Sequence, residues 1–258
     1  MKKIDEMKIV SQKEIAKNIF QLILQGKLVS EIERPGQFVH MKVGEGVDPL
    51  LRRPISICEI DRENQSMTCI YRTEGKGTTW LSKKQQGEYI NVLGPLGNGF
   101  PVQMKSGKVA LLIGGGIGVP PLYELSKQLR NRDIQVIHVL GFQTKSAVFL
   151  TKEFQRLGVT YIVTDDGSYG EKGFVTDVLK KQNFDFDRLY ACGPTPMLKA
   201  LEQKFPEKEV YLSLEERMSC GIGACFACVR PTKDREDKKG YRKICSDGPV
   251  FQAGEVIL

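Results

Sequence analysis

Four cysteines near the C-terminal end of the sequence have a spacing that suits an iron-sulfur centre. Cys220, Cys225 and Cys228 follow a C-x4-C-x2-C pattern, and Cys245 comes later in the chain. This order is typical of the plant-type ligands of a 2Fe-2S cluster, in which four thiolates hold two irons. Glycines and alanines between the first three cysteines leave room for backbone N–H groups to approach the sulfurs. The pattern therefore predicts a redox centre.

Two other interpretations of these thiols stay open. A zinc site usually has two short cysteine pairs, whereas only Cys225 and Cys228 form such a pair here, and inert thiols are the remaining possibility. The chain has seven cysteines, so complete disulfide pairing is excluded. Cys58, Cys69 and Cys192 are expected not to be ligands.

A glycine-rich turn, residues 114–121 with the sequence GGGIGVPP, lies between an expected strand and an expected helix. Glycines let a phosphate-bearing ligand approach the backbone, and a helix N-terminus favours a pyrophosphate. The G-x-G-x-x-G fingerprint fails, because Pro121 takes the place of the third glycine and no acidic residue ends the second strand. The turn is thus a nucleotide site of another kind or simply a tight turn.

A third group of residues could hold a diphosphate and a heteroaromatic ring. Two arginines and a Gly-Thr helix start offer donors to a diphosphate, and a serine hydroxyl could bond to a ring nitrogen. Each signal alone is weak, since either arginine could be an ordinary surface charge. The residues are Arg53, Pro54, Ile55, Ser56, Ile70, Tyr71, Arg72, Gly77 and Thr78.

The first hundred residues read as short strands separated by turns, with one helix beginning near Thr78. Pro and Gly residues occur regularly between the strands, which favours a small antiparallel barrel. From residue 108, strands alternate with helices, which predicts a parallel sheet with helices on both faces. The expected barrel strands are 18–24, 37–43, 54–60, 67–73 and 88–93. The expected sheet strands are 109–113, 134–140, 159–164, 189–191 and 210–214, and the helices are 120–130, 148–156, 174–181 and 196–204.

The fold class is therefore α/β plus β-barrel, with a cysteine-rich C-terminal loop region. We expect an N-terminal antiparallel barrel over residues 1–102, a parallel-sheet nucleotide domain over 103–211 and a 2Fe-2S cluster region over 212–258. The longest apolar run of note, 109–113, has five residues, against about 20 needed to span a bilayer. No secretory leader is recognised at the start, so a cytoplasmic protein is expected.

The net charge of +7 is concentrated in one segment. Residues 230–243 hold seven basic and three acidic side chains, a net of +4. A solvated loop and a docking surface for an acidic partner are both compatible with this pattern. A nucleic-acid partner is not expected, because more than half of the excess charge lies in this one loop.

Taken together, the barrel, the glycine turn and the cysteine loop resemble the ferredoxin reductase superfamily over nearly the whole chain. The resemblance is closest to the electron-transfer subunits of class B dihydroorotate dehydrogenases. No single motif suffices, and the order of the motifs makes the resemblance specific. The motifs are PGQF at 35–38, RPIS at 53–56, GPLGNGF at 94–100, the glycine turn, CGP at 192–194 and the C-terminal cysteines.

The resemblance implies that FAD binds between the barrel and the second domain, at Arg53 to Ser56, at Ile70 to Arg72 and at Gly77 with Thr78. Many relatives carry an aromatic residue where Ile55 stands, so stacking on the flavin passes to Tyr71 or is lost. A nicotinamide nucleotide would occupy the glycine turn and the CGP segment, with Cys192 near the ring. No residue of this chain is expected to act as a catalytic acid, base or nucleophile.

The resemblance also implies a direction of electron flow and a partner. Electrons would pass from dihydroorotate to FMN in a separate catalytic subunit, then through 2Fe-2S and FAD to NAD, in pyrimidine (UMP) biosynthesis. A heterotetramer with two copies of each subunit is expected. Two alternatives remain: a flavin subunit of a hydrogenase, a sulfhydrogenase or a ferredoxin:NAD(P) oxidoreductase, and a non-catalytic iron-sulfur binding or sensor protein.

Asp165 and Asp166 follow the strand 159–164 and bear on the choice of nucleotide. Relatives that prefer NADP tend to carry Ser and Arg there, whereas two carboxylates would repel a 2'-phosphate and could accept hydrogen bonds from the ribose of NAD. The other interpretation is that both aspartates simply open the turn before Gly167.

Overall fold

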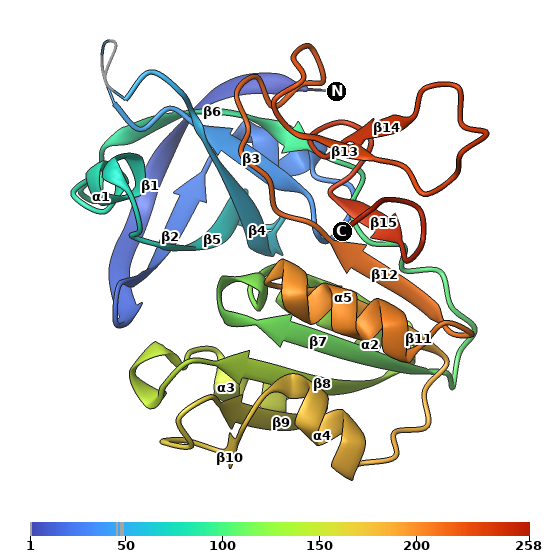
Figure 1. Cartoon of the computed structure of the whole chain (residues 1–258). Coiled ribbons are helices and arrows are strands. Elements are labelled where there is room, and N and C mark those ends of the chain that lie inside the picture. The colour runs from blue at the N-terminus through green and yellow to red at the C-terminus, as the bar shows by residue number, and fades with distance from the viewer. Residues whose placement is uncertain (1, 45, 47–48) are drawn as a thin grey trace.

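A computed structural model describes residues 2–44, 46 and 49–258 of the chain (Figure 1). The N-terminal part forms a barrel, the middle part forms a layered α/β domain, and the C-terminal segment runs back along both. Within the described residues, no helix is both long and apolar enough to cross a membrane.

Six antiparallel strands close the barrel in the order β1-β2-β5-β4-β3-β6. Side chains alternate between the two faces of a strand, and one face of each strand fills the barrel interior with apolar residues such as Met7, Leu22, Met41 and Cys69. Along the chain, helix α1 (Lys76–Leu81) follows β5 and precedes β6. The strands are β1 (Lys3–Ala16), β2 (Ile19–Gln25), β3 (Phe38–Met41), β4 (Arg53–Asp61), β5 (Ser66–Arg72) and β6 (Tyr89–Leu96).

The barrel confirms the predicted architecture and adds one strand that the sequence reading did not include. Strand β1 is rich in charged residues, and Met7 and Ile9 are its only side chains with no exposed surface. It pairs with β2 on one side and with β6 on the other. Its position thus depends on barrel closure more than on its own apolar pattern.

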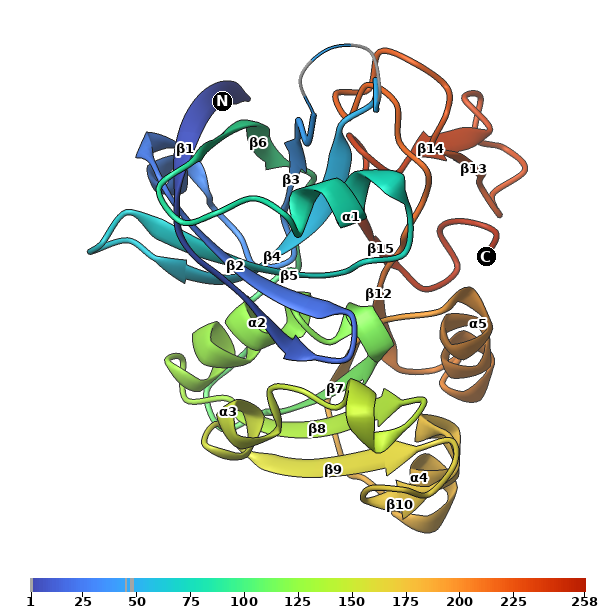
Figure 2. The same cartoon turned by 90° about the vertical axis from the view of Figure 1, so that its left-hand side faces the viewer.

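A seven-stranded sheet forms the centre of the α/β domain. Its strand order is β10-β9-β8-β7-β11-β12-β15. Helices cover both faces, with α2 and α3 on one side and α4 and α5 on the other, as Figure 2 shows. The strands are β7 (Val109–Gly115), β8 (Gln135–Phe142), β9 (Val159–Thr164), β10 (Glu171–Lys172), β11 (Arg188–Cys192), β12 (Glu209–Ser213) and β15 (Val250–Gln252). The helices are α2 (Pro121–Arg130), α3 (Thr151–Gln155), α4 (Val175–Lys181) and α5 (Thr195–Lys204).

Two details of this domain differ from the sequence prediction. The expected helix 148–156 is reduced to α3, because residues 145–147 form a 3-10 turn and Leu150 has a left-handed backbone, which no continuous helix allows. The sheet also gains two strands: the short β10, which pairs with β9, and β15 from the C-terminal segment, which pairs antiparallel with β12. Earlier in that segment, before β15, β13 (Val229–Pro231) and β14 (Tyr241–Lys243) pair as two antiparallel strands.

Helix α2 fastens the nucleotide domain to the barrel. Glu124 Oε2 accepts a hydrogen bond from the backbone amide of Ile60 at 3.1 Å, and Lys127 Nζ donates to Glu59 Oε1 at 2.7 Å. Ile60 and Glu59 belong to β4, and Glu124 is only 6% exposed. These contacts place the outer face of β4 and β5 opposite the ends of the sheet strands.

Candidate functional site

Arg53 and Gly77 are in direct contact at the edge of the barrel. Arg53 begins β4, and Gly77 is the second residue of α1. A Cβ atom at Gly77 would lie 2.3 Å from Arg53 Nε, so the guanidinium occupies space that only a glycine leaves open. The first amides of a helix have no partner within that helix. The guanidinium and the start of α1 together offer donors of the kind that a diphosphate binds.

The side chain of Thr78 stabilises the start of α1. Its hydroxyl oxygen accepts hydrogen bonds from the amides of Glu74 at 3.1 Å and of Gly75 at 3.3 Å. This is the arm of a capping box in which the third residue of a helix bonds back to the backbone amide of the N-cap residue. Thr78 therefore fixes α1 beside Arg53.

Neighbouring residues of β4 and β5 face opposite sides of the barrel wall. Ile55 and Tyr71 belong to the barrel core, and the Tyr71 hydroxyl donates to Gln12 Oε1 at 3.0 Å. Ile70 points the other way and packs against the nucleotide domain. Burial raises the pKa of Tyr71. The ring of Tyr71 thus lies inside the barrel, and a stacking role for it on a flavin outside the wall has no support in this geometry.

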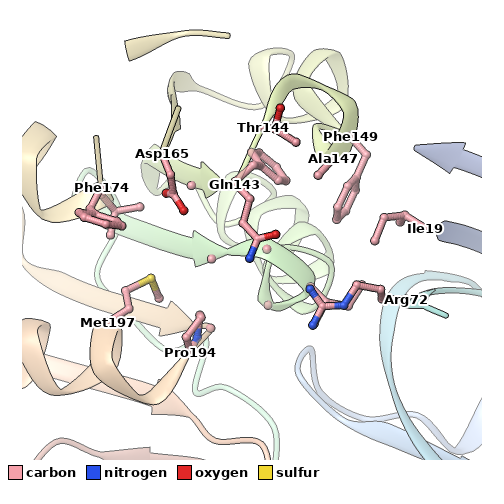
Figure 3. A pocket seen from close by; sticks show the side chains of 18 of the residues that line it. Ile19, Arg72, Gln143, Thr144, Ala147, Phe149, Asp165, Phe174, Pro194 and Met197 are labelled. Atoms are coloured by element: carbon pink, nitrogen blue, oxygen red, sulfur yellow. The ribbon is translucent and has the colours of Figure 1, made fainter. Parts of the chain in front are cut away.

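A cavity of about 790 Å³ lies between the barrel and the nucleotide domain (Figure 3). Ile19 and Arg72 line it from the barrel side, and the glycine turn lines it from the sheet side. The cavity is located at the carboxyl ends of β7, β8, β9 and β11, where open parallel sheets bind their ligands. Its volume lies in the range of small-molecule and cofactor sites.

Close backbone contacts explain the glycines of the turn. A Cβ atom at Gly118 would lie 2.3 Å from the carbonyl oxygen of Cys192, and Gly116 has a positive φ of 54°. A Cβ atom at Gly115 would lie 2.9 Å from Met197 Sδ. The turn after β7 is therefore pressed against the end of β11, and larger residues would separate the two.

Asp165 and Asp166 play different roles. Asp165 lines the cavity, on the side opposite Arg72 in Figure 3. Desolvation and the neighbouring Asp166 charge raise its pKa. Asp166 instead accepts hydrogen bonds from the hydroxyl and the amide of Ser168, which lower its pKa to about 2. The turn interpretation thus holds for Asp166, whereas Asp165 is placed to contact a nucleotide.

The end of the cavity near the barrel combines a cation and a carboxylate. Arg72 pairs with Glu74 at 2.6 Å, and its Nε is buried without a hydrogen-bond partner. Glu215 lines the same cavity and is exposed to solvent. Desolvation by the surrounding protein raises the pKa of Glu215, while the Arg72 charge acts in the opposite direction. Gly193 and Pro194 also line the cavity, whereas the Cys192 thiol is 2% exposed and packs into the core.

The four C-terminal cysteines come together as two pairs. The Cys220 side chain interacts with Cys225, and the Cys245 side chain interacts with Cys228 and more weakly with Cys220, so the two pairs adjoin. Within the described residues, no three or more His, Cys, Asp or Glu side chains are arranged so that they could bind a single metal ion. Two thiol pairs match a centre with two irons, each of which takes two protein thiolates.

The cysteine loop also provides the donors that a thiolate needs. The amide of Cys225 donates to Cys220 Sγ at 3.3 Å. Burial opposes ionisation of the Cys220 thiol, but hydrogen bonds from loop amides outweigh this effect and lower its pKa to about 6. Burial and the neighbouring Cys228 thiol raise the pKa of Cys245 to about 12. The loop therefore favours negative charge at its more exposed end.

The first turn of the cysteine loop rests on His40 of β3. A Cβ atom at Gly221 would lie 2.5 Å from His40 Nδ1, so the loop backbone covers the imidazole ring. His40 has no exposed surface, and neither ring nitrogen forms a hydrogen bond. Burial lowers its pKa to about 4, although the nearby backbone of Arg52 and Cys220 acts in the opposite direction. A buried, unpartnered ring at this place fits a group held between the cysteines.

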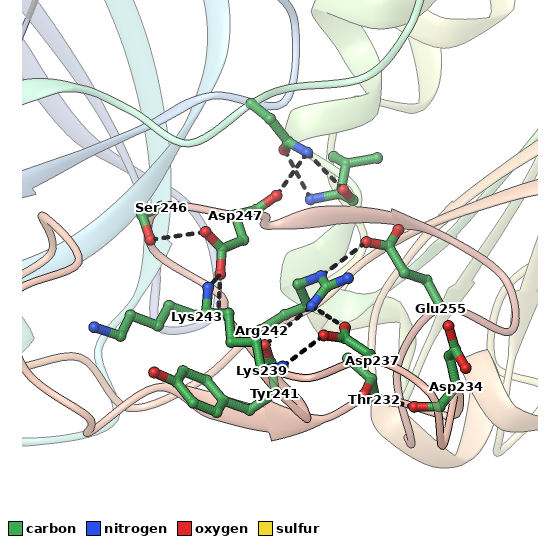
Figure 4. A network of polar contacts seen from close by, with 12 residues as sticks. Thr232, Asp234, Asp237, Lys239, Tyr241, Arg242, Lys243, Ser246, Asp247 and Glu255 are labelled. Carbon is green, nitrogen blue, oxygen red and sulfur yellow. Dashed lines mark hydrogen bonds and ion pairs between the residues drawn. The ribbon is translucent and has the colours of Figure 1, made fainter.

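Asn98 and Asp247, the second of which is labelled in Figure 4, fasten the cysteine loop to the rest of the molecule. Asn98 Nδ2 donates to the carbonyl oxygens of Asp247 and Val250 at 3.1 and 2.7 Å. The carboxylate of Asp247 accepts hydrogen bonds from the Lys243 amide and from Lys239 Nζ. Because Asn98 follows β6, these bonds tie the loop to the barrel end.

Most cations of the basic segment 230–243 are paired within the chain. Arg242 bonds to Asp237 and lies near Glu255, as Figure 4 shows, and Lys239 bonds to Asp247. Arg230 pairs with Glu216, and Lys233 with Glu202. Acidic residues inside and outside the segment thus pair with four of its seven cations, so it is a cross-linked loop more than a free basic surface.

Sequence reasoning did not identify His40, Asn98 or Glu215 as parts of the site. His40 and Asn98 reach it through contacts with residues about 150 or more positions away. Glu215 comes two residues after β12, the last parallel strand, and belongs to no motif. Only the small number of histidines in the chain, two, could have drawn attention to His40.

Comparisons with known proteins agree with this geometry. Residues 112–203 match the model of the oxidoreductase NAD-binding domain, and residues 215–257 match the iron-sulfur cluster binding domain of dihydroorotate dehydrogenase B. The structure of an NADH-dependent reduced ferredoxin-NADP oxidoreductase aligns with a TM-score of 0.86 and 32% identity, over 98% of this chain and 90% of that one. A ferredoxin reductase of carbazole 1,9a-dioxygenase, at 20% identity, shares the fold with a TM-score of 0.69, over 81% of this chain and 67% of that one.

The fold and the site define a ferredoxin-reductase-type oxidoreductase with an added cysteine-loop region. Proteins of Bacillus cereus and Bacillus anthracis, named dihydroorotate dehydrogenase B (NAD(+)), electron transfer subunit, are 59% identical over 98% of this chain and 98% of their own length. The chain belongs to this family of electron transfer subunits.

Proposed function

We propose that the chain carries electrons from the FMN of a dihydroorotate dehydrogenase catalytic subunit, through a 2Fe-2S cluster and FAD, to NAD+ in pyrimidine biosynthesis. The observation that carries the proposal is the order of three sites across neighbouring strands. The cysteine loop covers His40 on β3, the Arg53 segment lies on β4, and Arg72 at the end of β5 borders the cavity. Strands β3, β4 and β5 are adjacent in the barrel.

This order suits the chemistry of the three groups. NAD accepts two electrons as a hydride, whereas an iron-sulfur cluster transfers one electron at a time. A flavin exchanges electrons in either number, so it belongs between the other two. The residues of this chain therefore have to bind, orient and insulate the groups, and none of them has to act on dihydroorotate.

The residue assignments follow the same proposal. Cys220 and Cys225 would hold one iron, and Cys228 and Cys245 the other, in line with the two pairs. The FAD diphosphate would contact Arg53 and the start of α1, and the isoalloxazine would lie along the outer wall of the barrel. The proposed FAD residues are Arg53, Pro54, Ile55, Ser56, Ile70, Tyr71, Arg72, Gly77 and Thr78, with Ile55 and Tyr71 contributing through their backbone.

The cavity would hold the nicotinamide nucleotide. Asp165 at one side suits the hydroxyl groups of an adenosine ribose, and the glycine turn suits the diphosphate. The nicotinamide would then point toward Gly193, Glu215 and Arg72, which is the side nearest the proposed flavin. The direction of the ligand thus follows from the positions of the acidic residue and the barrel wall.

The name of the relatives, which are subunits, supports a partner protein. We propose the FMN-containing catalytic subunit as this partner, in a heterotetramer with two copies of each chain, located in the cytoplasm. We also keep the division into a barrel over residues 1–102, a nucleotide domain over 103–211 and a cluster region over 212–258. The last two regions share one sheet, since β12 (Glu209–Ser213) runs across this boundary and β15 of the cluster region pairs with it.

The experiment that tests this proposal compares electron donors in a reconstituted complex. The chain is co-expressed with the FMN-containing catalytic subunit and purified anaerobically, and NAD+ reduction is followed with dihydroorotate or reduced ferredoxin as the donor. Dihydroorotate is expected to support NAD+ reduction only when both chains are present. NAD+ reduction with reduced ferredoxin as the donor, but not with dihydroorotate, would instead favour the ferredoxin:NAD(P) oxidoreductase alternative. The similarity to a ferredoxin-NADP oxidoreductase is the reason for testing this alternative.

A further inference from the structure

The two histidines of the chain are both fully buried but differ in their hydrogen bonding. His138, in β8, is satisfied at both ring nitrogens: Nε2 bonds with Ser126 Oγ at 2.8 Å and Nδ1 with Thr160 Oγ1 at 3.0 Å. His40, in β3, has no hydrogen-bond partner at either nitrogen. A buried polar group without a partner is uncommon, so the His40 ring requires an explanation.

The position of His40 indicates where its partner has to be. Val39 and Met41 on either side belong to the barrel core, so the strand alternation directs the His40 side chain outward. There the cysteine loop covers it, with the backbone of Gly221 against Nδ1. The backbone of Arg52 and of Cys220 also approaches the ring and favours a proton on it, but neither contact has the geometry of a full hydrogen bond.

His40 also adjoins the proposed flavin strand. It is the register partner of Pro54 in β4, and its carbonyl oxygen accepts a hydrogen bond from Arg52 Nη1 at 3.2 Å. The imidazole thus stands between the RPIS segment on one side and the first cysteine of the loop on the other. No other side chain in the described part of the chain has been found with this combination of burial, unpartnered nitrogens and contact with the loop.

We propose that a ring N–H of His40 donates a hydrogen bond to a sulfur atom of the cluster at its Cys220 end and thereby raises the reduction potential of the cluster. A neutral imidazole has one such donor. Hydrogen bonds to the sulfurs are among the factors that set cluster potentials, because a donor stabilises the reduced form, which carries one more negative charge. His40 is then a tuning and positioning residue for electron transfer, and the inference rests on the proposed function.

The first test is spectroscopic and uses the unaltered protein. The FAD-loaded chain is produced with 15N-histidine, the cluster is reduced, and nitrogen hyperfine coupling to its paramagnetic signal is measured. His138 belongs to a separate sheet and is already fully bonded, so a histidine coupling has to arise from His40. A 15N coupling is expected, and its absence from a normal reduced-cluster signal would overturn the proposal.

The second test uses variants with matched controls. His40→Leu removes the donor, His40→Gln keeps an N–H donor, and His138→Gln alters the other buried histidine. With equal iron and sulfide contents, the cluster potential is expected to shift downward in His40→Leu, to recover at least partly in His40→Gln and to stay unchanged in His138→Gln. An unchanged potential in His40→Leu would contradict the proposal.

The two tests together separate the possible failures. If His40→Leu does not assemble a cluster, the 15N measurement on the unaltered chain still decides. If the unaltered chain shows no reduced-cluster signal, the proposed function fails, and the His40 inference fails with it. A normal cluster signal without histidine coupling removes only the role of His40.

Discussion

The Arg53 guanidinium lies directly over the Cα atom of Gly77, so a single methyl group at Gly77 would stand 2.3 Å from Nε. This contact joins the first residue of β4 to the start of α1. It places a permanent positive charge beside free helix amides at the edge of the barrel. The position of Arg53 therefore depends on a residue that has no side chain.

Gly77→Ala is expected to weaken FAD binding by tenfold to a hundredfold, because it displaces Arg53. Hydrogen bonds to charged groups contribute about 1.5–3 kcal/mol, and each 1.4 kcal/mol is about tenfold in affinity. Alanine favours helices more than glycine does, so a loss cannot come from helix propensity. The measurement is the FAD dissociation constant from flavin fluorescence.

Gly75→Ala provides the matched control, since a Cβ atom there meets nothing within 4 Å. It should bind FAD as the unaltered chain does. Arg53→Ala should reproduce the loss seen with Gly77→Ala. Unchanged affinity in both Arg53→Ala and Gly77→Ala would remove this contact from the FAD site.

Asp165→Ser is expected to raise kcat/KM for NADPH relative to NADH by about tenfold or more. The carboxylate lines the cavity, and its removal relieves repulsion of a 2'-phosphate. Asp166→Ser is the control, because Asp166 is bonded to Ser168 in its own turn. Steady-state diaphorase assays with both nucleotides decide, and an equal gain in the two variants would show that the turn and not Asp165 sets the preference.

Cys225→Ser and Cys228→Ser are expected to lose most of the iron while NADH-driven reduction of FAD continues. Each change breaks one of the two thiol pairs, and neither residue borders the nucleotide cavity. Iron analysis and flavin bleaching on addition of NADH provide the two readouts. Cys69→Ala, a change inside the barrel, should keep its iron. Full iron content in either serine variant would show that the ligand assignment is wrong.

Glu124→Ala is expected to lower the free energy of unfolding by about 1–3 kcal/mol, because it leaves the Ile60 amide without its acceptor at the domain contact. A chain of this size then loses roughly 2–4 °C in Tm for each kcal/mol. Glu124→Gln keeps an acceptor oxygen and should stay close to the unaltered protein near neutral pH. Equal losses in both variants would mean that charge, and not the hydrogen bond, holds the contact.

The same residue gives a pH dependence with a definite sign. Burial raises the folded-state pKa of Glu124 above its unfolded value. The part of the stability that comes from protonation of this carboxyl group is therefore complete below the unfolded pKa, about 4.3, and is lost as the pH rises through the folded pKa. Glu124→Gln should remove this part of the stability profile, which urea unfolding at several pH values measures.

Local patterns allowed most of the fold to be predicted. The barrel strands β2 to β6 and the alternating elements after residue 108 have clear apolar periods, and the cysteine spacing is a local signal for a cluster. Strand β1 has no such period, because its charged side chains face solvent and pairing with β2 and β6 holds it. Its place depends on closure of the barrel.

Long-range contacts account for the parts of the site that sequence reasoning did not reach. His40 meets the cysteine loop only after β3 and that loop are brought together, and Asn98 meets Asp247 in the same way. The basic loop looked like a free charged surface because its acidic partners, such as Glu202 and Glu216, lie outside it. Spacing along the chain contains no information of this kind.

The most direct test of the central claim is the cofactor content of the anaerobically purified chain. An absorbance spectrum is recorded, and FAD, iron and acid-labile sulfide are quantified on the same sample. The account predicts one FAD and one 2Fe-2S cluster per chain, with both reduced and reoxidised without loss. A chain with FAD but no iron and sulfide, or with a cluster but no flavin, would contradict it.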